Sequence, residues 1–89
     1  MYPLICRKAV LESQMESEEQ IINEMCQFDT ERYPYIKKDK FNYEAAGDLI
    51  VITYKIYNTE SQIASKIDVF KKNGYTIWNN DETLYLQEV

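Results

Sequence analysis

The sequence predicts an α+β fold, in which two helices pack on an antiparallel sheet within a single domain. Helix-capping sequences support the two helices: Ser-Glu-Glu-Gln at residues 17–20 and Thr-Glu-Ser-Gln at residues 59–62. In each, the hydroxyl oxygen can accept from a backbone amide of the first turn, while Gln reaches back to the cap amide. β-Branched and aromatic residues dominate residues 49–57, which supports the sheet. A chain of 89 residues has room for one domain, residues 1–89.

The helices are predicted at residues 18–29 and 60–72, where apolar residues recur at helical spacing. These residues are Ile21, Ile22, Met25 and Phe28 in the first helix, and Ile63, Ala64, Ile67 and Phe70 in the second. Gly74 supplies the left-handed residue that ends the second helix, after Lys71 and Lys72, whose charges suit its C-terminal end. The same geometry predicts a contact between Tyr75 and Phe70.

Strands are predicted at residues 2–11, 33–44, 49–57 and 75–88, with a turn at residues 45–48. The last segment is either one strand or a hairpin that turns at residues 79–81. The resulting order is β-α-β-β-α-β, the split βαβ arrangement called ferredoxin-like, with both helices on one face of the sheet. The alternative is a meander sheet with helices at its ends.

The two predicted helices are related by an offset of 42 residues, with seven identities in 27 aligned positions. The identities pair Glu18 with Glu60, Gln20 with Gln62, Ile21 with Ile63, Phe28 with Phe70, Tyr33 with Tyr75, Asp39 with Asp81 and Tyr43 with Tyr85. They suggest pseudo-repeat halves at about residues 2–44 and 47–88. The alternative is two unrelated amphipathic helices that share common capping chemistry.

The central strand at residues 49–57 predicts a second apolar surface. Alternation places Ile50, Ile52, Tyr54 and Ile56 toward the helices. The opposite side carries Leu49, Val51, Thr53, Lys55 and Tyr57. This side is more apolar than a solvated surface needs to be, which favours a protein-binding face formed by Leu49, Val51, Thr53 and Tyr57. Shielding by Tyr and Lys side chains is the alternative.

Acidic residues gather at the first helix, with no Lys or Arg between residues 12 and 31. They are Glu12, Glu16, Glu18, Glu19, Glu24, Asp29 and Glu31. We expect the glutamates to form a face that docks on a basic surface of another protein. The alternative is a solvated helix exterior.

Aromatic residues on an open sheet could instead stack on RNA bases. The candidates are Tyr33, Tyr35, Phe41, Tyr43, Tyr57, Tyr75, Trp78 and Tyr85. A formal net charge of −5 makes nucleic acid an improbable partner, because phosphate repels it. The basic cluster, opposed by Asp39, consists of Arg32, Lys37, Lys38 and Lys40.

Catalytic groups are scarce. The chain has no His and only two Gly, so general acid–base work and a nucleotide cradle have few candidates. Cys6 and Cys26 do not complete a zinc site, and both are expected to be buried apolar residues. Asp39 and Asp81 read as turn residues rather than as paired carboxylates. We therefore expect a protein without enzymatic activity, metal or cofactor.

Composition bears on location and origin. No apolar segment resembles a signal peptide or membrane span, and the start at Met1 suggests a complete cytoplasmic gene product. Abundant Lys, Asn, Ile, Tyr and Glu are typical of AT-rich genomes, such as those of low-GC bacteria and their phages.

The leading hypothesis is a small acidic protein that binds and modulates or inhibits a larger protein. One version is a phage-type inhibitor of a nucleic-acid enzyme. The first alternative is a homodimeric ferredoxin-like sensor of a small ligand, or an assembly module. The second is RNA binding by the Tyr-rich sheet.

Overall fold

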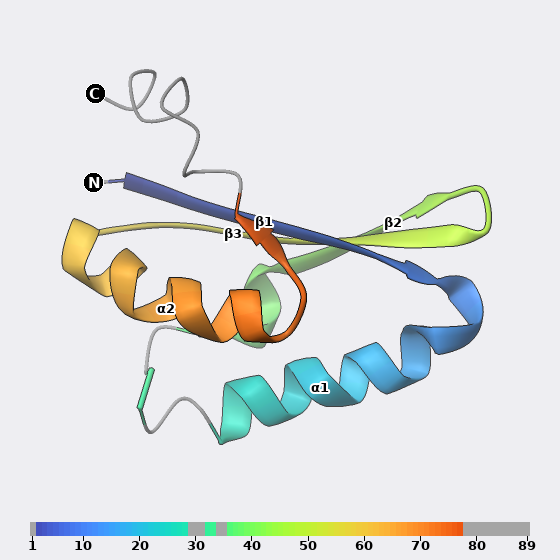
Figure 1. Ribbon diagram of the computed structural model, residues 1–89, viewed down its shortest axis with the longest axis horizontal. Helices are drawn as coiled ribbons and strands as arrows, with labels where there is room; N and C mark the ends of the chain where they lie inside the picture. Colours follow the sequence, from blue (N-terminus) through green and yellow to red (C-terminus); the bar gives the residue numbers. More distant parts are fainter. Residues whose placement is uncertain (1, 29–31, 34–35, 78–89) are drawn as a thin grey trace.

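The computed structural model describes residues 2–28, 32–33 and 36–77, and Figure 1 shows their arrangement. The strands are β1 (Tyr2–Leu11), β2 (Phe41–Ala46), β3 (Leu49–Asn58) and β4 (Thr76–Ile77). The α-helices are α1 (Met15–Gln27) and α2 (Glu60–Lys72), and the 3-10 helices are η1 (Glu12–Gln14) and η3 (Lys38–Lys40). The predicted β-α-β-β-α-β order of the main elements is therefore observed.

The four strands form one antiparallel open sheet in the order β2-β3-β1-β4. β1 pairs with β3 over its whole length, from Tyr2 opposite Asn58 to Leu11 opposite Leu49. Because β1 and β2 both run antiparallel to β3, they are parallel to each other on its two sides. Both α-helices lie on the same side of the sheet (Figure 1), which confirms the α+β prediction and leaves the opposite side to form an outer face.

The core lies between the sheet and the helices. The strands contribute Leu4, Cys6, Val10, Phe41, Ile52 and Tyr54, all buried. Burial of this apolar surface supplies the main driving force for the fold. At its centre the rings of Tyr54 and Phe70 stack with centroids 4.7 Å apart, and Phe41 lies 4.8 Å from Tyr54. Such aromatic pairs add stability beyond the area they bury.

The second helix agrees with its prediction at both ends. It spans Glu60–Lys72 with Thr59 as N-cap, although the Thr59 side chain makes no capping hydrogen bond. At its C-terminus, the Tyr75 N–H donates to the Phe70 carbonyl at 3.0 Å, and the Gly74 N–H donates to the Lys71 carbonyl at 3.0 Å. Gly74 has φ +85°, which completes a Schellman motif. The predicted contact of Tyr75 with Phe70 is present at 5.3 Å between ring centroids.

The first helix begins earlier than predicted, at Met15 instead of residue 18. Its N-cap is Gln14, without a side-chain capping bond, so Ser17 lies inside the helix and does not cap it. The reason is the preceding turn: η1 follows β1 directly, and the Glu12 N–H donates to the Asp48 carbonyl at 3.0 Å. This bond turns the chain into the helix three residues before the expected cap.

The two helices begin 45 residues apart, not 42. Phe28 is exposed, whereas Phe70, its partner in the 42-residue register, is buried. These two positions are not equivalent in the structure, and duplication of the two halves stays a prediction.

The predicted strand at residues 33–44 is confirmed only in part. Of its described residues, 33 and 36–44, those from Phe41 onward form a strand, whereas Lys38–Lys40 form a 3-10 turn. The hairpin turn consists of Gly47 and Asp48, and Gly47 has φ +66°, a value that glycine adopts most readily. β4 is described only over Thr76–Ile77, and the rest of the predicted strand or hairpin lies outside the described residues. Within the described part of the chain, no helix has the length and apolar character to cross a membrane.

Candidate functional site

The outer face of the sheet carries the residues predicted for it. In the register, Leu49, Val51, Thr53 and Tyr57 of β3 lie opposite Leu11, Ala9, Arg7 and Pro3 of β1. The alternate residues of β3 pack against the helices, as predicted: Ile50, Ile52, Tyr54 and Ile56. Leu11 and Leu49 are directly opposed and remain 48% and 38% exposed. This apolar pair is therefore partly open to solvent.

The described aromatic residues do not form a stacking platform on that face. Phe41 and Tyr75 belong to the buried aromatic cluster, and Tyr43 lies on the helix side of β2, opposite Ile52. Among the described candidates on the strands, Tyr57 alone lies on the outer face, since alternation sends the odd-numbered residues of β2 toward the helices. Tyr35, Trp78 and Tyr85 lie outside the described residues. RNA binding by the sheet stays a prediction.

Most of the predicted acidic face is exposed. Glu12, Glu16, Glu19 and Glu24 all have exposed side chains, whereas Glu31 lies outside the described residues. The helical repeat separates Glu19 from Glu24 by about 140° around the axis of α1. These two residues therefore lie on opposite flanks of the helix. Glu19 faces Lys38, with 4.0 Å between the Glu19 Oε1 and Lys38 Nζ atoms.

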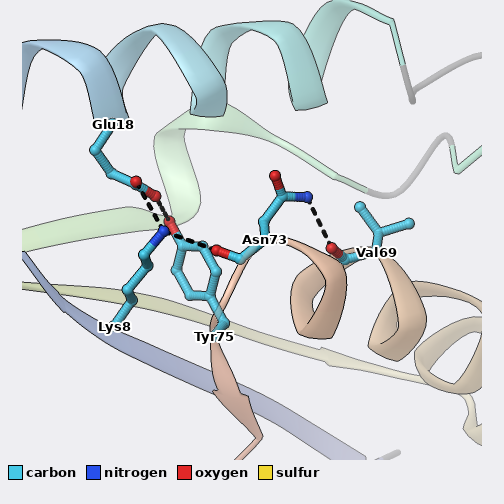
Figure 2. Close-up of polar contacts among 5 residues, drawn as sticks. All are labelled: Lys8, Glu18, Val69, Asn73 and Tyr75. Atoms are coloured by element: carbon cyan, nitrogen blue, oxygen red, sulfur yellow. Dashed lines mark hydrogen bonds and ion pairs between the residues drawn. The ribbon is translucent and has the colours of Figure 1, made fainter.

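Glu18 is a correction to the predicted face, because its side chain is only 5% exposed and points into the molecule. Figure 2 shows it between α1 and the sheet. The Lys8 ammonium donates to Glu18 Oε2 at 3.0 Å and to the Asn73 carbonyl at 2.8 Å. The Tyr75 hydroxyl donates to Glu18 Oε1 at 2.9 Å. Glu18 thus joins β1, α1 and the end of α2, and its carboxylate is not available to a partner.

The buried position of this network determines the protonation state of Tyr75. Burial raises the pKa of the Tyr75 hydroxyl, and the charge and hydrogen bond of Glu18 raise it further. Tyr75 therefore stays protonated and acts as a hydrogen-bond donor. Lys8 could have been found from the sequence, because it alternates with Leu4, Cys6 and Val10 on the inward side of its strand.

A groove of about 390 Å³ lies beside the acidic helix. Ile21, Glu24, Met25 and Phe28 of the α1 segment line it, together with Asn73 at the end of α2. The Asn73 side-chain amide donates to the Val69 carbonyl at 2.8 Å, which fixes that wall (Figure 2). Phe28 is 74% exposed, although its spacing predicts a core residue. The groove therefore combines an apolar wall and an exposed aromatic ring from the α1 segment with polar groups from Glu24 and Asn73.

Buried reactive groups contribute little chemistry. Burial raises the pKa of the Cys6 thiol to about 12, so it is not a nucleophile near neutral pH. Cys26 is half-buried, and burial raises its pKa too. Lys66 is fully buried on the inward side of α2, and its ammonium lies 3.4 Å from the Tyr54 hydroxyl. Across the described residues, no three potential metal ligands come together.

No protein-family model matches the chain, and no curated protein or solved structure is significantly similar to it.

Proposed function

We propose that this protein is a non-catalytic binding protein that modulates or inhibits a larger protein. Its binding surface comprises the groove between α1 and α2 with the exposed Glu24 and Glu16, and its target is a basic segment with an apolar anchor. The observation that carries the proposal is Phe28, which is 74% exposed in the lining of that groove.

The groove offers the anchor site. Interface energy concentrates in a few apolar and aromatic contacts that lose their water on binding. Ile21, Met25 and Phe28 supply such surface, and the groove can accept one large side chain of the partner. An exposed Phe at the end of a helix gains little for the monomer, so a partner that covers it gains binding energy.

The exposed carboxylates of α1 would provide the electrostatic part of partner recognition. Glu16, Glu19 and Glu24 are exposed on a helix without Lys or Arg, and Glu24 also borders the groove. A partner segment with Lys or Arg beside its apolar anchor would match both features. Exposed charges of this kind accelerate association and improve specificity more than they tighten binding. A nucleic-acid enzyme is one class of target, because it presents a basic substrate surface.

The experiment is affinity capture from a low-GC bacterial lysate, followed by dissociation constants for the purified captured protein. The test variants are Phe28→Ala and the combined Glu16→Gln and Glu24→Gln. The matched control is Glu60→Gln with Asp68→Asn, which removes two exposed carboxylates from α2. Glu18 is left intact, because its loss would disturb the fold.

We expect Phe28→Ala to weaken binding tenfold or more, about 1.4 kcal/mol or above. The double glutamine variant should lower the association rate and its salt dependence, whereas the control should behave like wild type. Equal affinity of wild type and Phe28→Ala for the captured protein would refute the proposal.

A second candidate is a homodimer that buries the outer face. Its support is the exposed pair formed by Leu11 and Leu49. The same face also carries the exposed charged residues Arg7 and Lys55, which a dimer would have to take out of water, and this ranks the homodimer second. Light scattering should show dimers that Leu49→Lys dissociates, and a monomer at all concentrations would exclude them.

For the fold we propose the ferredoxin-like class, a split βαβ unit repeated as β-α-β-β-α-β. Its support is the position of β3 between the parallel strands β1 and β2, with α1 as their crossover.

A further inference from the structure

The edge of β3 is open beyond the start of β2. Pairing of β2 with β3 begins at Phe41 opposite Tyr54, and no described residue pairs with Lys55–Asn58 on that side. In an antiparallel ladder, alternate residues direct their N–H and C=O groups to alternate neighbours. Two of these four residues therefore direct their backbone groups to the side where β2 would continue, where no described residue pairs with them.

A cleft of about 510 Å³ lies against this open edge. One wall consists of β3 residues Lys55, Ile56, Tyr57 and Asn58, and the other of Lys37, Asp39, Lys40 and Asn42. The cleft is separate from the groove between the helices, with which it shares no residue.

Three lysines give this cleft its charge. Lys37, Lys40 and Lys55 are exposed. No described carboxylate forms an ion pair with any of these three lysines. Asp39 is the single acidic residue of the lining. The cleft therefore has an excess of positive charge, although the whole protein has a net charge of −5, and this local excess favours an anionic ligand.

The wall that carries Lys37 and Lys40 is anchored in the core. Ile36 is buried, and its N–H donates to the Tyr33 carbonyl at 3.2 Å. A backbone hydrogen bond joins Lys37 to the hydroxyl of Tyr54, a core residue. Burial raises the pKa of Tyr54, and this bond lowers it. The Lys40 N–H donates to the Lys37 carbonyl at 3.2 Å. These contacts hold the wall in place before a ligand arrives, which reduces the entropic cost of binding.

We propose that this cleft binds an extended acidic peptide segment, which continues the line of β2 along β3. The main chain of the segment would pair with the open edge at Lys55–Asn58, as in β-strand addition. Its carboxylates would lie beside Lys37, Lys40 and Lys55. Four residues of open edge, about 13 Å long, match a short strand and exceed a single phosphate group.

The probe is a blocked hexapeptide that alternates Glu and Val, with a Lys–Val hexapeptide as its opposite-charge counterpart. Binding to the full chain is measured by calorimetry at low salt. The combined change Lys37→Gln, Lys40→Gln and Lys55→Gln should weaken the Glu–Val peptide about tenfold, since exposed ion pairs contribute modestly. The control, Lys38→Gln with Lys71→Gln and Lys72→Gln, removes the same charge outside the cleft and should change affinity less than twofold.

Backbone pairing is tested with two further Glu–Val peptides, N-methylated at odd or at even positions. Only one of the two should lose binding, because a paired strand directs alternate amides to its neighbour. Equal affinity of both methylated peptides would overturn strand addition. Tighter binding of inorganic phosphate or of a thymidine oligonucleotide would overturn the peptide as ligand, as would preference for the Lys–Val peptide.

Discussion

Replacing Glu18 by Gln should destabilise the fold, although the change keeps the size and shape of the side chain. The carboxylate accepts from Lys8 and from Tyr75, at 3.0 and 2.9 Å. Hydrogen bonds to charged groups contribute about 1.5–3 kcal/mol each, against about 0.5–1.5 kcal/mol for neutral pairs. Gln retains an acceptor for Tyr75, so that bond loses about 1 kcal/mol. The Lys8 side chain is 23% exposed and keeps its bond to the Asn73 carbonyl, so the loss of its charged partner costs about 1 kcal/mol more.

The sum is about 2 kcal/mol, or roughly 10 °C in Tm for a domain of this size. Urea unfolding followed by circular dichroism measures the loss. Glu16→Gln is the matched control, because Glu16 is exposed in the same helical turn and should cost less than about 0.5 kcal/mol. Equal stability of the two variants would refute the assignment of Glu18 to the interior. A double-mutant cycle of Lys8→Met with Glu18→Leu should show a coupling of about 1–2 kcal/mol.

Other predictions concern a buried charge and two glycines. Burial lowers the pKa of Lys66 from 10.5 to about 8, so the unfolded chain binds the extra proton between these values and stability rises with pH there. From pH 7 to pH 9, the free energy of unfolding of wild type should therefore rise by about 1 kcal/mol relative to that of Lys66→Met, as measured by urea unfolding. If the free energies of the two proteins changed in parallel with pH, this prediction would be contradicted. Subtracting the variant cancels the opposite effect of the Cys6 thiol. Gly74→Ala and Gly47→Ala should each cost about 1–2 kcal/mol, since both glycines have positive φ. At Gly74 the added Cβ would lie at ordinary contact distance from Lys8, 3.4 Å from Cε, and at Gly47 it would contact no atom, so the two thermal shifts should be similar. Unchanged stability of either variant would contradict the backbone strain.

The sequence predicted the elements with strong local signals. β1 and α2 have the predicted bounds, because alternation defines the strand and the Gly74 stop defines the helix end. The outer and inner faces of β3 also follow from alternation alone. Local chemistry suffices where a segment encodes its own geometry.

Features that depend on distant partners were missed. Ser17 has the side chain of a cap, yet the bond between Glu12 and Asp48 starts the helix earlier. The helical pattern alone predicts an exposed Glu18, because its partners, Lys8 and Tyr75, are far away in the sequence.

Phe28 was the other misplaced residue. It continues the apolar spacing of α1, but α1 ends at Gln27 and the ring remains exposed. The groove that it borders forms only when α1 and α2 are side by side, so no local pattern predicts it.

The central claim is that the groove between α1 and α2 receives the partner. The most direct measurement is an NMR titration of the labelled protein with the purified captured protein, followed through its backbone amides. The account predicts that the largest shifts map to Ile21, Glu24, Met25 and Phe28, and that the Phe28→Ala variant needs at least about ten times more captured protein to reach half of its full shifts. Shifts confined to the outer face, at Leu11, Leu49 and Val51, would contradict it.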